Sequence, residues 1–265
     1  MKRLAVLGHP VAHSRSPAMQ NAALKELGLA DEWHYEAIDV APEDFEPTVG
    51  EMVAGDFVGA NVTIPHKEAA LRLADTATPQ AKAIGAANTL SFRHGAVEAD
   101  NTDAGGLLDA LPESPAGKRG LVLGAGGAAR AVVWALNNEG AEVEVWNRTA
   151  SRASELCFDL GGAPVSDPSQ SDYKLIVNTT SVGLQGEDPF DGPLPLKEGE
   201  FKSEQVIVDL VYSASPTKLA RAAREAGAPT VDGIEILVRQ GARSLRIWTG
   251  QEPPLDVIRA AARSE

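Results

Sequence analysis

The chain has 265 residues, of which 43% are hydrophobic, enough for two modest domains with ordinary globular cores. Its formal net charge is −13 and its basic residues form no long run, so nucleic-acid binding is not expected. The one cysteine, Cys157, allows no disulfide bond within the chain, which favours a cytoplasmic location. No segment approaches the roughly 18 consecutive apolar residues of a membrane-spanning helix, so no membrane partner is expected.

The first part of the chain alternates predicted strands and helices. Strands are predicted at residues 4–8, 34–40 and 57–62, and helices at residues 16–27, from about 42, and at 66–73. Residues 88–92 and 96–98 then predict a hairpin around the turn His94-Gly95, followed by a helix over 102–111. Residues 112–117, which include two prolines and a glycine, predict a loop or linker.

The second part of the chain repeats the alternation. Strands are predicted at residues 120–123, 142–146, 175–178, 206–209 and 230–231, and helices at 127–138, 151–160, 217–225, 237–248 and 255–261. Strands that alternate with helices imply a parallel sheet with right-handed crossovers. We therefore predict an α/β fold.

A glycine-rich turn follows the first strand of this second part. Residues 124–130 read Gly-Ala-Gly-Gly-Ala-Ala-Arg, in the form G-x-G-x-x-A, and open a predicted helix. A helix N-terminus carries unpaired N–H groups and about half a unit of positive charge, which suits a pyrophosphate. Gly124 permits the tight turn, Gly126 has no Cβ to obstruct the phosphate, and Ala129 lets the helix pack closely on the strand. The turn predicts a dinucleotide site.

The residues after the next strand select the nucleotide. In an NAD site an acidic residue at this place accepts hydrogen bonds from the ribose 2′-hydroxyl. Here the place holds Asn147, followed by Arg148 and Thr149, with Arg152 about one helical turn further on. A guanidinium attracts a 2′-phosphate, which a carboxylate would repel. The sequence therefore predicts NADP as the cofactor, against the alternative that both arginines are merely solvated at the start of a helix.

Two polar clusters precede the glycine-rich turn, and each also has a purely structural explanation. Ser14 and Ser16 flank a loop–helix boundary, where hydroxyl groups commonly cap the helix. Asn61 and Thr63 end a buried strand, at the edge where open sheets commonly bind ligands. Lys67 follows them within about one helical turn. In isolation, the serine pair is better explained as a cap.

A third cluster, Asn101-Thr102-Asp103, opens a predicted helix, where Thr102 or Asp103 could serve only as the N-cap. In this order the clusters and the glycine-rich turn resemble the shikimate dehydrogenases, NADP-dependent enzymes that reduce 3-dehydroshikimate to shikimate in aromatic amino-acid biosynthesis. The resemblance covers nearly the whole chain. Its motifs are Ser-x-Ser-Pro at 14–17, Asn-Val-Thr-Ile-Pro-His-Lys at 61–67, Gly-Ala-Ala-Asn-Thr at 85–89, Asn-Thr-Asp at 101–103, the glycine-rich turn, Asn-Arg-Thr at 147–149 and Asp-Gly-Ile-Glu-Ile-Leu-Val-Arg-Gln at 232–240.

The resemblance implies a role for each matching residue, with Lys67 and Asp103 as the catalytic pair. The serines would hold the substrate carboxylate, and Tyr212 matches a tyrosine of the family's substrate pocket. The substrate-binding residues would be Ser14, Ser16, Thr63, Lys67, Asn88, Asp103, Tyr212 and Gln240. The cofactor-binding residues would be Gly124, Ala125, Gly126, Gly127, Ala128, Asn147, Arg148, Thr149, Arg152, Leu210 and Gly233, the last two on the nicotinamide side.

The catalytic pair predicts a proton-transfer chemistry. When hydride reaches the ketone carbon, negative charge grows on its oxygen, and the Lys67 ammonium could stabilise that charge and donate a proton. Asp103 should pair with Lys67 and hydrogen-bond a neighbouring ring hydroxyl. A carboxylate partner favours the charged lysine and burial favours the neutral one. The sequence therefore leaves open whether Lys67 is a full acid/base or chiefly an electrostatic clamp.

Two positions depart from the family's pattern. Members usually read Tyr-x-Pro-x-x-Thr after the strand that ends near Asp209, whereas here Tyr212 and Thr217 keep their spacing but the proline is displaced to Pro216. Because proline fixes φ, this loop is expected to follow a different path after Tyr212 than it does in other members. Asp100 stands where a small or aromatic residue is expected, and nothing in the sequence accounts for it.

Three other functions compete with this interpretation. A quinate/shikimate dehydrogenase of the same family often uses NAD, against which Arg148 argues. A catalytically silent NADP-binding sensor would not need both Lys67 and Asp103. Another oxidoreductase with this type of nucleotide domain, such as a glutamyl-tRNA reductase or a methylene-folate dehydrogenase, would not explain the serine pair together with Asn88.

The expected architecture has two domains. Residues 1–101 with 238–265 would form an α/β substrate-binding domain, and residues 102–237 a Rossmann-type NADP-binding domain with a parallel sheet. The small-molecule substrate and NADP are the expected ligands, with no metal, because no cluster of His, Cys, Asp and Glu has metal-ligand spacing. The sequence leaves the oligomeric state open, with a homodimer as one option.

Overall fold

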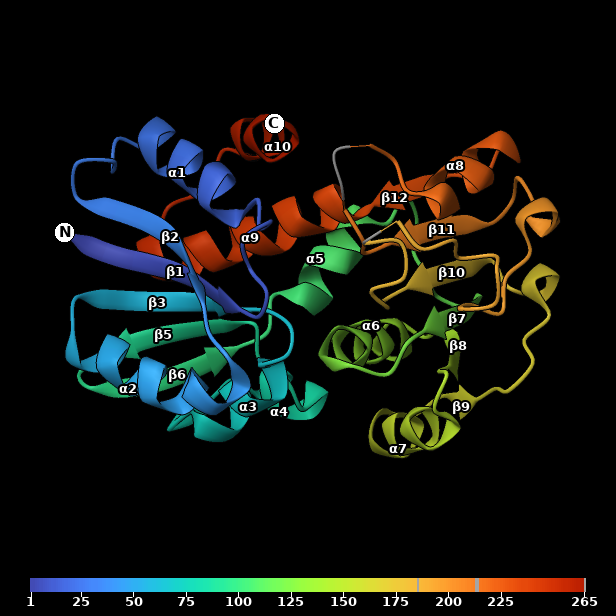
Figure 1. Ribbon diagram of the computed structural model, residues 1–265, viewed down its shortest axis with the longest axis horizontal. Helices are drawn as coiled ribbons and strands as arrows, with labels where there is room; N and C mark the ends of the chain where they lie inside the picture. The colour runs from blue at the N-terminus through green and yellow to red at the C-terminus, as the bar shows by residue number, and fades with distance from the viewer. Residues whose placement is uncertain (185, 213–214, 265) are drawn as a thin grey trace. The chain divides into compact units, whose positions relative to one another are not determined.

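The computed structural model describes residues 1–184, 186–212 and 215–264, and it confirms the α/β fold class (Figure 1). The chain divides into two compact units. Unit 1 comprises Met1–Gly106 and Leu237–Glu265, and unit 2 comprises Leu107–Ile236. Ser213 and Ala214, which belong to the loop expected to depart from the family's path, lie outside the described residues.

Unit 1 is built on a mixed six-stranded sheet in the order β2-β1-β3-β5-β6-β4. Its strands are β1 (Lys2–Gly8), β2 (Trp33–Asp39), β3 (Phe57–Val62), β4 (Thr76–Ala77), β5 (Thr89–Arg93) and β6 (Ala96–Asp100). The strands β2, β1 and β3 are parallel, whereas β5 is antiparallel to β3 and β6 is antiparallel to β5. The hairpin reversal therefore brings the start of β5 and the end of β6 to the edge where β1 and β3 end. This edge collects the polar clusters of the sequence.

Helices cover both faces of this sheet (Figure 1). The helices wholly within unit 1 are α1 (Ser16–Glu26), α2 (Phe45–Ala54), α3 (Lys67–Leu73), α4 (Pro79–Ile84) and α10 (Leu255–Arg263). Two further helices, α5 (Asp103–Ala110) and α9 (Gly233–Thr249), cross the boundary between the units along the chain. Successive residues of a strand point to opposite faces. Ala60 and Val62 accordingly join the core under α2, whereas Gly59 and Asn61 face α9, whose Trp248 indole donates to the Leu90 carbonyl at 3.0 Å.

Unit 2 is built on an entirely parallel sheet in the order β12-β11-β10-β7-β8-β9. Its strands are β7 (Arg119–Leu123), β8 (Glu142–Trp146), β9 (Ala163–Pro164), β10 (Leu175–Asn178), β11 (Val206–Asp209) and β12 (Thr230–Asp232). Renumbered from β7, this is the order 3-2-1-4-5-6 of the Rossmann fold, and the order reverses between β7 and β10. In such sheets ligands bind beyond the carboxyl ends of the strands at that reversal. Gly124 follows β7 directly, at this point.

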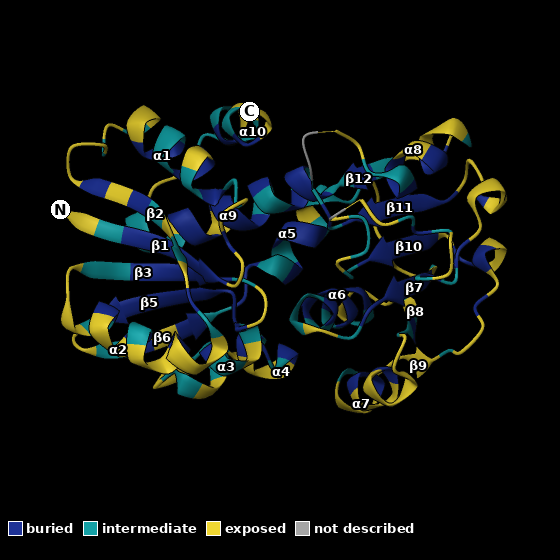
Figure 2. Ribbon diagram, in the orientation of Figure 1, coloured by how far each residue is buried: buried dark blue, intermediate teal, exposed yellow. Residues whose placement is uncertain are grey.

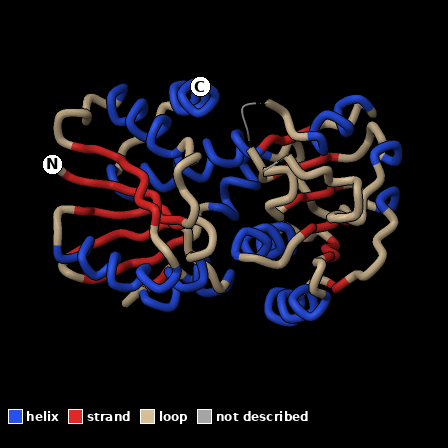
Figure 3. The backbone as a smooth tube through the Cα atoms, viewed as in Figure 1, coloured by secondary structure: helices blue, strands red, loops and turns tan. Residues whose placement is uncertain are grey.

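The helices of unit 2 are α6 (Gly127–Asn138), α7 (Ala150–Leu160) and α8 (Lys218–Glu225). Figure 2 shows the strands of both sheets as largely buried and the outer helix surfaces as exposed, and Figure 3 traces the loops that leave the strand ends. The apolar runs of β7, β10 and β11 fit strands that are covered on both faces. Within the described residues, no helix combines the length and the apolar character needed to cross a bilayer.

Most predicted elements are confirmed within two residues, and the main differences have local causes. Helix α9 begins at Gly233 rather than at residue 237, because the Asp232 carboxylate accepts a hydrogen bond from the Glu235 N–H at 2.9 Å and caps the helix. Helix α4, absent from the sequence prediction, is capped by Thr78, whose hydroxyl accepts from the Ala81 N–H at 3.1 Å. The strands β4 and β9 are also absent from the sequence prediction, because two residues are too few to show the alternation of apolar and polar side chains that indicates a strand.

Candidate active site

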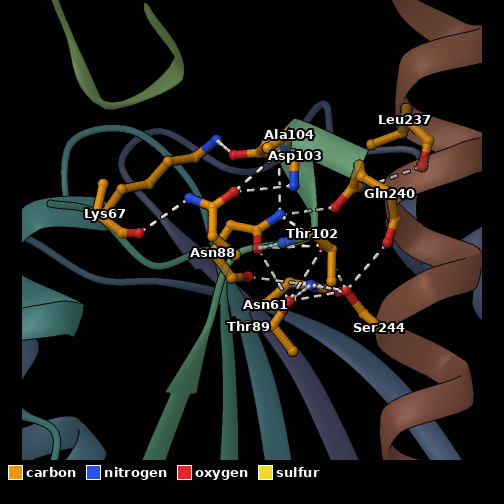
Figure 4. Close-up of polar contacts among 12 residues, drawn as sticks. Asn61, Lys67, Asn88, Thr89, Thr102, Asp103, Ala104, Leu237, Gln240 and Ser244 are labelled. Carbon is orange, nitrogen blue, oxygen red and sulfur yellow. Dashed lines mark hydrogen bonds and ion pairs between the residues drawn. The ribbon is translucent and has the colours of Figure 1, made fainter. Parts of the chain in front are cut away.

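The centre of the polar edge in unit 1 is an ion pair between Lys67 and Asp103 (Figure 4). The distance from Lys67 Nζ to Asp103 Oδ2 is 2.6 Å, and the side chains are 12% and 17% exposed. The pairing expected from the sequence is thus present across 36 residues of chain. Both groups are mostly shielded but still reach the surface, so they can meet a small molecule without burying an unpaired charge.

Asp103 is free for this role because another residue caps its helix. The side-chain oxygen of Asn101 accepts from the N–H groups of Asp103 and Ala104 at 3.1 and 3.3 Å. The alternative in which Thr102 or Asp103 caps α5 is therefore wrong. Capping by Asn101 leaves the Asp103 carboxylate at the positive end of the helix, a favourable place for a negative charge.

Asn88 holds the second oxygen of Asp103. Its Nδ2 donates to Asp103 Oδ1 at 2.8 Å and to Gln240 Oε1 at 3.1 Å. Its Oδ1 accepts from the backbone N–H of Thr102 at 2.8 Å. Because a backbone N–H can only donate, this bond fixes which end of the Asn88 amide faces Asp103.

Gln240 is oriented in the same way. Its Nε2 donates to the Leu237 carbonyl at 2.8 Å, and its Oε1 accepts from Asn88. The second Nε2 hydrogen is available for a ligand hydroxyl. Lys67, Asn88, Asp103 and Gln240, four of the predicted substrate-binding residues, therefore form one hydrogen-bonded cluster (Figure 4).

Five buried residues behind this cluster are absent from the predicted site, namely Tyr35, Asn61, Thr89, Thr102 and Ser244. Asn61 Oδ1 accepts from the Tyr35 hydroxyl at 2.8 Å, and its Nδ2 donates to Ser244 Oγ at 2.9 Å. Thr102 contacts both Asn88 and Ser244 through its hydroxyl. Three of them have a signal in the sequence, because Asn61 is a polar residue in a predicted buried strand, and Thr89 and Thr102 lie in the Gly-Ala-Ala-Asn-Thr and Asn-Thr-Asp motifs. Nothing in the sequence indicates that Tyr35 and Ser244 are their hydrogen-bond partners.

Lys67 is placed by a rigid turn between β3 and α3. His66, which is 1% exposed, stacks on Phe45 with ring centroids 4.5 Å apart, and its Nε2 lies 2.7 Å from the Val40 carbonyl. The Lys67 carbonyl accepts from the Ala87 N–H at 2.8 Å. These contacts bury the His66 ring in the core and hold the turn that precedes Lys67.

Ser14, Ser16 and Thr63 belong to the same edge. Ser14 and Ser16 follow the end of β1, and Ser14 Oγ accepts from the Ser16 N–H at 3.3 Å. The N-cap position of α1 is Arg15, and its side chain makes no capping hydrogen bond, so the helix-cap explanation of the serine pair is not supported. An accepting hydroxyl can still donate its own proton to a carboxylate. Thr63 follows β3, the parallel neighbour of β1. A Cβ on Gly8 would lie 2.4 Å from Thr63 Cγ2, so Gly8 permits this approach.

Asp100, the unexplained departure from the family's pattern, now has a structural explanation. Its Oδ1 accepts from the Thr78 hydroxyl at 2.9 Å and from the Asn101 N–H at 2.7 Å. The same Thr78 hydroxyl caps α4. Asp100 therefore connects the end of β6 to the start of α4.

In unit 2 the glycine-rich turn has the shape that a pyrophosphate needs. Gly124 has φ +111°, and a Cβ there would lie 2.5 Å from Thr179 Oγ1, so no other residue fits without strain. A Cβ on Gly126 would meet only open space, which is where an approaching phosphate would sit. Gly126 has no side chain to cap α6, so the N–H groups of its first turn remain available as donors. These features fit a dinucleotide.

The four residues expected at the 2′-phosphate lie in the loop after β8 (Asn147, Arg148 and Thr149) and in the first turn of α7 (Arg152). Asn147 Nδ2 donates to the Thr149 carbonyl at 2.9 Å, and the Arg152 N–H donates to the same carbonyl at 3.1 Å. Arg148, Thr149 and Arg152 are exposed. Arg130, the last residue of the glycine-rich turn motif, forms an ion pair with Asp159 at 3.0 Å. Two exposed guanidinium groups beside one loop fit a doubly charged phosphate better than a neutral hydroxyl.

Leu210 and Gly233 meet at the carboxyl edge of β11. A Cβ on Gly233 would lie 2.5 Å from the Leu210 carbonyl oxygen, so only glycine allows α9 to start here. The Asp209 carboxylate, 2% exposed, accepts from Asn178 Nδ2 and from the Thr217 hydroxyl at 2.9 and 2.6 Å. Burial raises the pKa of the Asp209 carboxyl above its ordinary value, and these bonds oppose the shift.

Tyr212, half-buried, follows this strand end in unit 2. The bond from Thr217 back to Asp209 joins the two ends of the loop that carries Tyr212. Serine and alanine at 213 and 214 lie outside the described residues, so the role of Tyr212 toward a substrate stays a prediction.

Three family models match the chain. The shikimate dehydrogenase substrate-binding domain matches residues 6–90, the shikimate/quinate 5-dehydrogenase model matches residues 109–182, and the shikimate 5′-dehydrogenase C-terminal domain matches residues 233–263. The three ranges include the segments of both units that carry most of the predicted site.

Relatives match along almost the full length. The NADP(+) shikimate dehydrogenase of Anaeromyxobacter sp. strain K is 44% identical over 274 residues, which cover 98% of this chain and 95% of that protein. The crystal structure of shikimate dehydrogenase from Aquifex aeolicus has a TM-score of 0.92 at 39% identity and covers 100% of this chain and 98% of that one. The Thermus thermophilus shikimate 5-dehydrogenase in complex with NADP(H) and shikimate has a TM-score of 0.89 at 44% identity, with 99% of each chain covered.

Proposed function

The chain belongs to the shikimate dehydrogenase family, and we propose that it catalyses the reversible, NADPH-dependent reduction of 3-dehydroshikimate to shikimate in the shikimate pathway. Unit 1 would be the substrate-binding domain and unit 2 the NADP-binding domain. The observation that carries this proposal is the ion pair of Lys67 and Asp103 in one cluster with Asn88 and Gln240. That cluster joins a proton donor to several hydroxyl-binding groups, as reduction of a polyhydroxylated ketone requires.

Lys67 would donate the proton that the ketone oxygen gains in this reaction. Bound NADPH supplies a hydride to the ketone carbon, and the protein has to stabilise the charge that grows on the ketone oxygen. An ammonium group at hydrogen-bond distance from that oxygen stabilises the charge and can donate the proton. Asp103 holds the ammonium in place by its 2.6 Å contact and can accept from a hydroxyl next to the ketone.

The remaining polar groups of unit 1 would orient the ring. The hydroxyls of Ser14 and Ser16 would donate to the substrate carboxylate, and Thr63 would contact a ring hydroxyl from the neighbouring strand end. Asn88 and Gln240 have fixed amide orientations, so they would present one defined pattern of donors and acceptors. Such preorganisation lowers the cost of binding a rigid ring.

NADP is the cofactor that the residues of unit 2 fit. The turn at Gly124 and Gly126 with the start of α6 would hold the pyrophosphate, and Arg148 and Arg152 would hold the 2′-phosphate. Leu210 and Gly233 would lie on the nicotinamide side. The absence of a carboxylate at Asn147 favours NADP over NAD, because a carboxylate there would repel the phosphate.

Two other functions remain to be tested against this one. A broader quinate/shikimate dehydrogenase would oxidise quinate as well as shikimate, and a silent sensor would bind NADP without turnover. The intact ion pair, mostly shielded yet still reaching the surface, favours an enzyme over a sensor. We further propose a cytoplasmic location, from the single cysteine, and a homodimer, which sedimentation velocity would test.

The decisive experiment is spectrophotometric. The purified chain is mixed with shikimate and NADP⁺, and the formation of NADPH is followed by its absorbance, with quinate and NAD⁺ in parallel reactions. We expect NADPH to form with shikimate and NADP⁺. Equal turnover of quinate would support the broader enzyme, and a flat absorbance with measurable NADP⁺ binding would support the sensor.

A further inference from the structure

Three buried hydroxyl groups meet directly behind Asn88 (Figure 4). They belong to Thr89 at the start of β5, Thr102 just before α5 and Ser244 on α9, and each residue is at most 5% exposed. Thr89 Oγ1 lies 2.8 Å from Ser244 Oγ, which lies 3.0 Å from Thr102 Oγ1, and the two threonine oxygens are 3.3 Å apart. We call these three residues the hydroxyl cluster. It joins three separate segments of unit 1.

The single proton of each hydroxyl limits the hydrogen bonds around the hydroxyl cluster. Ser244 Oγ donates to the Gln240 carbonyl at 3.1 Å, so it accepts from its other neighbours. One of these is Asn61 Nδ2 at 2.9 Å, and another is a threonine hydroxyl. Each threonine hydroxyl has one proton, so when one of them donates to Ser244 Oγ the other can donate to Asn88 Oδ1, which lies 3.0 Å from Thr89 Oγ1 and 3.1 Å from Thr102 Oγ1. Each of the three hydroxyls thus has a partner, and Asn88 Oδ1 accepts from one threonine hydroxyl as well as from the Thr102 N–H.

This arrangement acts on both amides of the candidate active site. Donors around Oδ1 keep the opposite end of the Asn88 amide, its Nδ2, turned toward Asp103 and Gln240. Ser244 stands one helical turn after Gln240 and binds its carbonyl, so the same oxygen connects this turn of α9 to β5 and to the start of α5. Networks of this kind, when fully satisfied, favour a single side-chain arrangement.

We propose that Thr89, Thr102 and Ser244 are positioning residues, which hold the Asn88 and Gln240 amides in the orientation that receives the ring hydroxyls. This inference rests on the function proposed above. The hydroxyl cluster does not touch the substrate; it acts through Asn88 and Gln240. Because those amides would bind the ring before and during the reaction alike, their misorientation should weaken substrate binding more than it slows turnover.

The test compares two variants that each remove one hydroxyl, the near-isosteric Thr102→Val and the smaller Ser244→Ala, with the conservative Thr102→Ser. Thr249→Val is the matched control, because Thr249 Oγ1 donates to the Leu245 carbonyl on the same helix, at 2.8 Å, in the way that Ser244 donates to Gln240. KM for shikimate, KM for NADP⁺ and kcat are measured with stability from urea unfolding. A role limited to stability would lower the unfolding midpoint in all three hydroxyl-removing variants without raising KM.

We expect KM for shikimate to rise by about three- to tenfold in Thr102→Val and in Ser244→Ala, the effect of losing one buried hydrogen bond. KM for NADP⁺ should stay unchanged, kcat should fall by about twofold at most, and Thr102→Ser should keep the KM of the parent chain. The control Thr249→Val should also keep it. Unchanged KM for shikimate in both variants would overturn the inference.

A second readout is independent of turnover. The side-chain amide resonances of Asn88, assigned by their loss in Asn88→Asp, are followed by NMR in the parent chain and in the double variant Thr102→Val/Ser244→Ala. We expect the double variant to shift these resonances and to speed their exchange with solvent by about tenfold, in line with the loss of one hydrogen bond. If the parent chain fails to oxidise shikimate, the proposed function falls and this readout alone decides the positioning role. Identical amide resonances would refute it.

Discussion

Removal of the Lys67 ammonium is the perturbation that tests the proposed chemistry most directly. Lys67→Ala leaves Asp103 held by Asn88, so the change removes the proton donor while one bond to its partner persists. We expect kcat to fall by roughly 10²–10⁴-fold, the usual range for lost acid–base assistance.

The magnitude follows from the geometry. An ammonium about 3 Å from an oxygen that carries about half a charge stabilises it by about 3 kcal/mol at an effective dielectric constant of about 20. At about 1.4 kcal/mol for each tenfold in rate, this electrostatic part alone corresponds to roughly 10². Proton donation would account for the remainder of the range. The turn after β3 fixes the Lys67 backbone next to Ala87, whose N–H donates to the Lys67 carbonyl at 2.8 Å.

Steady-state kinetics of shikimate oxidation, with the unfolding midpoint as a check on folding, measure the loss. Lys67→Arg separates the two roles, because a guanidinium keeps its charge but does not release its proton in proteins. An arginine variant that retains most of the activity identifies an electrostatic clamp, whereas one as slow as Lys67→Ala identifies a proton donor. Near-normal turnover by Lys67→Ala would refute the assignment of Lys67 to the chemistry.

Three further predictions concern the cofactor, the packing and the pH dependence. Arg148→Asp should weaken NADP⁺ binding by more than about tenfold and reduce the ratio of the affinity for NADP⁺ to that for NAD⁺. Titration calorimetry with both nucleotides measures these affinities, and an unchanged ratio would show that Arg148 does not hold the 2′-phosphate. Gly59→Ala should lower the free energy of unfolding by about 2–4 kcal/mol, because its Cβ would lie 2.6 Å from the Leu90 carbonyl and displace the Trp248 indole. Its control Gly50→Ala, in α2 with nothing near the added Cβ, should gain up to about 1 kcal/mol in denaturant unfolding. Asp209 has a raised pKa in the folded state, so the free energy of unfolding of the parent chain should fall as pH rises above about 4. Asp209→Asn lacks this titration, so its free energy of unfolding should rise relative to that of the parent between about pH 4 and 7. A difference between the two that does not change with pH would contradict this.

The sequence was most informative where a local pattern has a single physical cause. The turn at Gly124 was predictable because tight geometry and phosphate approach both exclude side chains, and the structure shows a Cβ clash at Gly124 and open space at Gly126. The pairing of Lys67 with Asp103 came from the family's motifs, and the 2.6 Å contact confirms it. The sequence does not decide which side chain caps α5, because Asn101, Thr102 and Asp103 are all residue types that cap helices, and the structure shows Asn101 in that role.

By itself, the sequence determined the α/β class, the approximate bounds of most elements and the residue types of both sites. These follow from hydrophobic periodicity and from motifs, which are properties of neighbouring residues. Only the tertiary structure decided which buried groups support the site: that Tyr35 binds Asn61, that Ser244 joins Thr89 and Thr102, and that Asp100 ties β6 to α4. The reason is that a hydrogen bond depends on distance and direction between segments far apart in the chain, and these are fixed only when sheet and helices pack together.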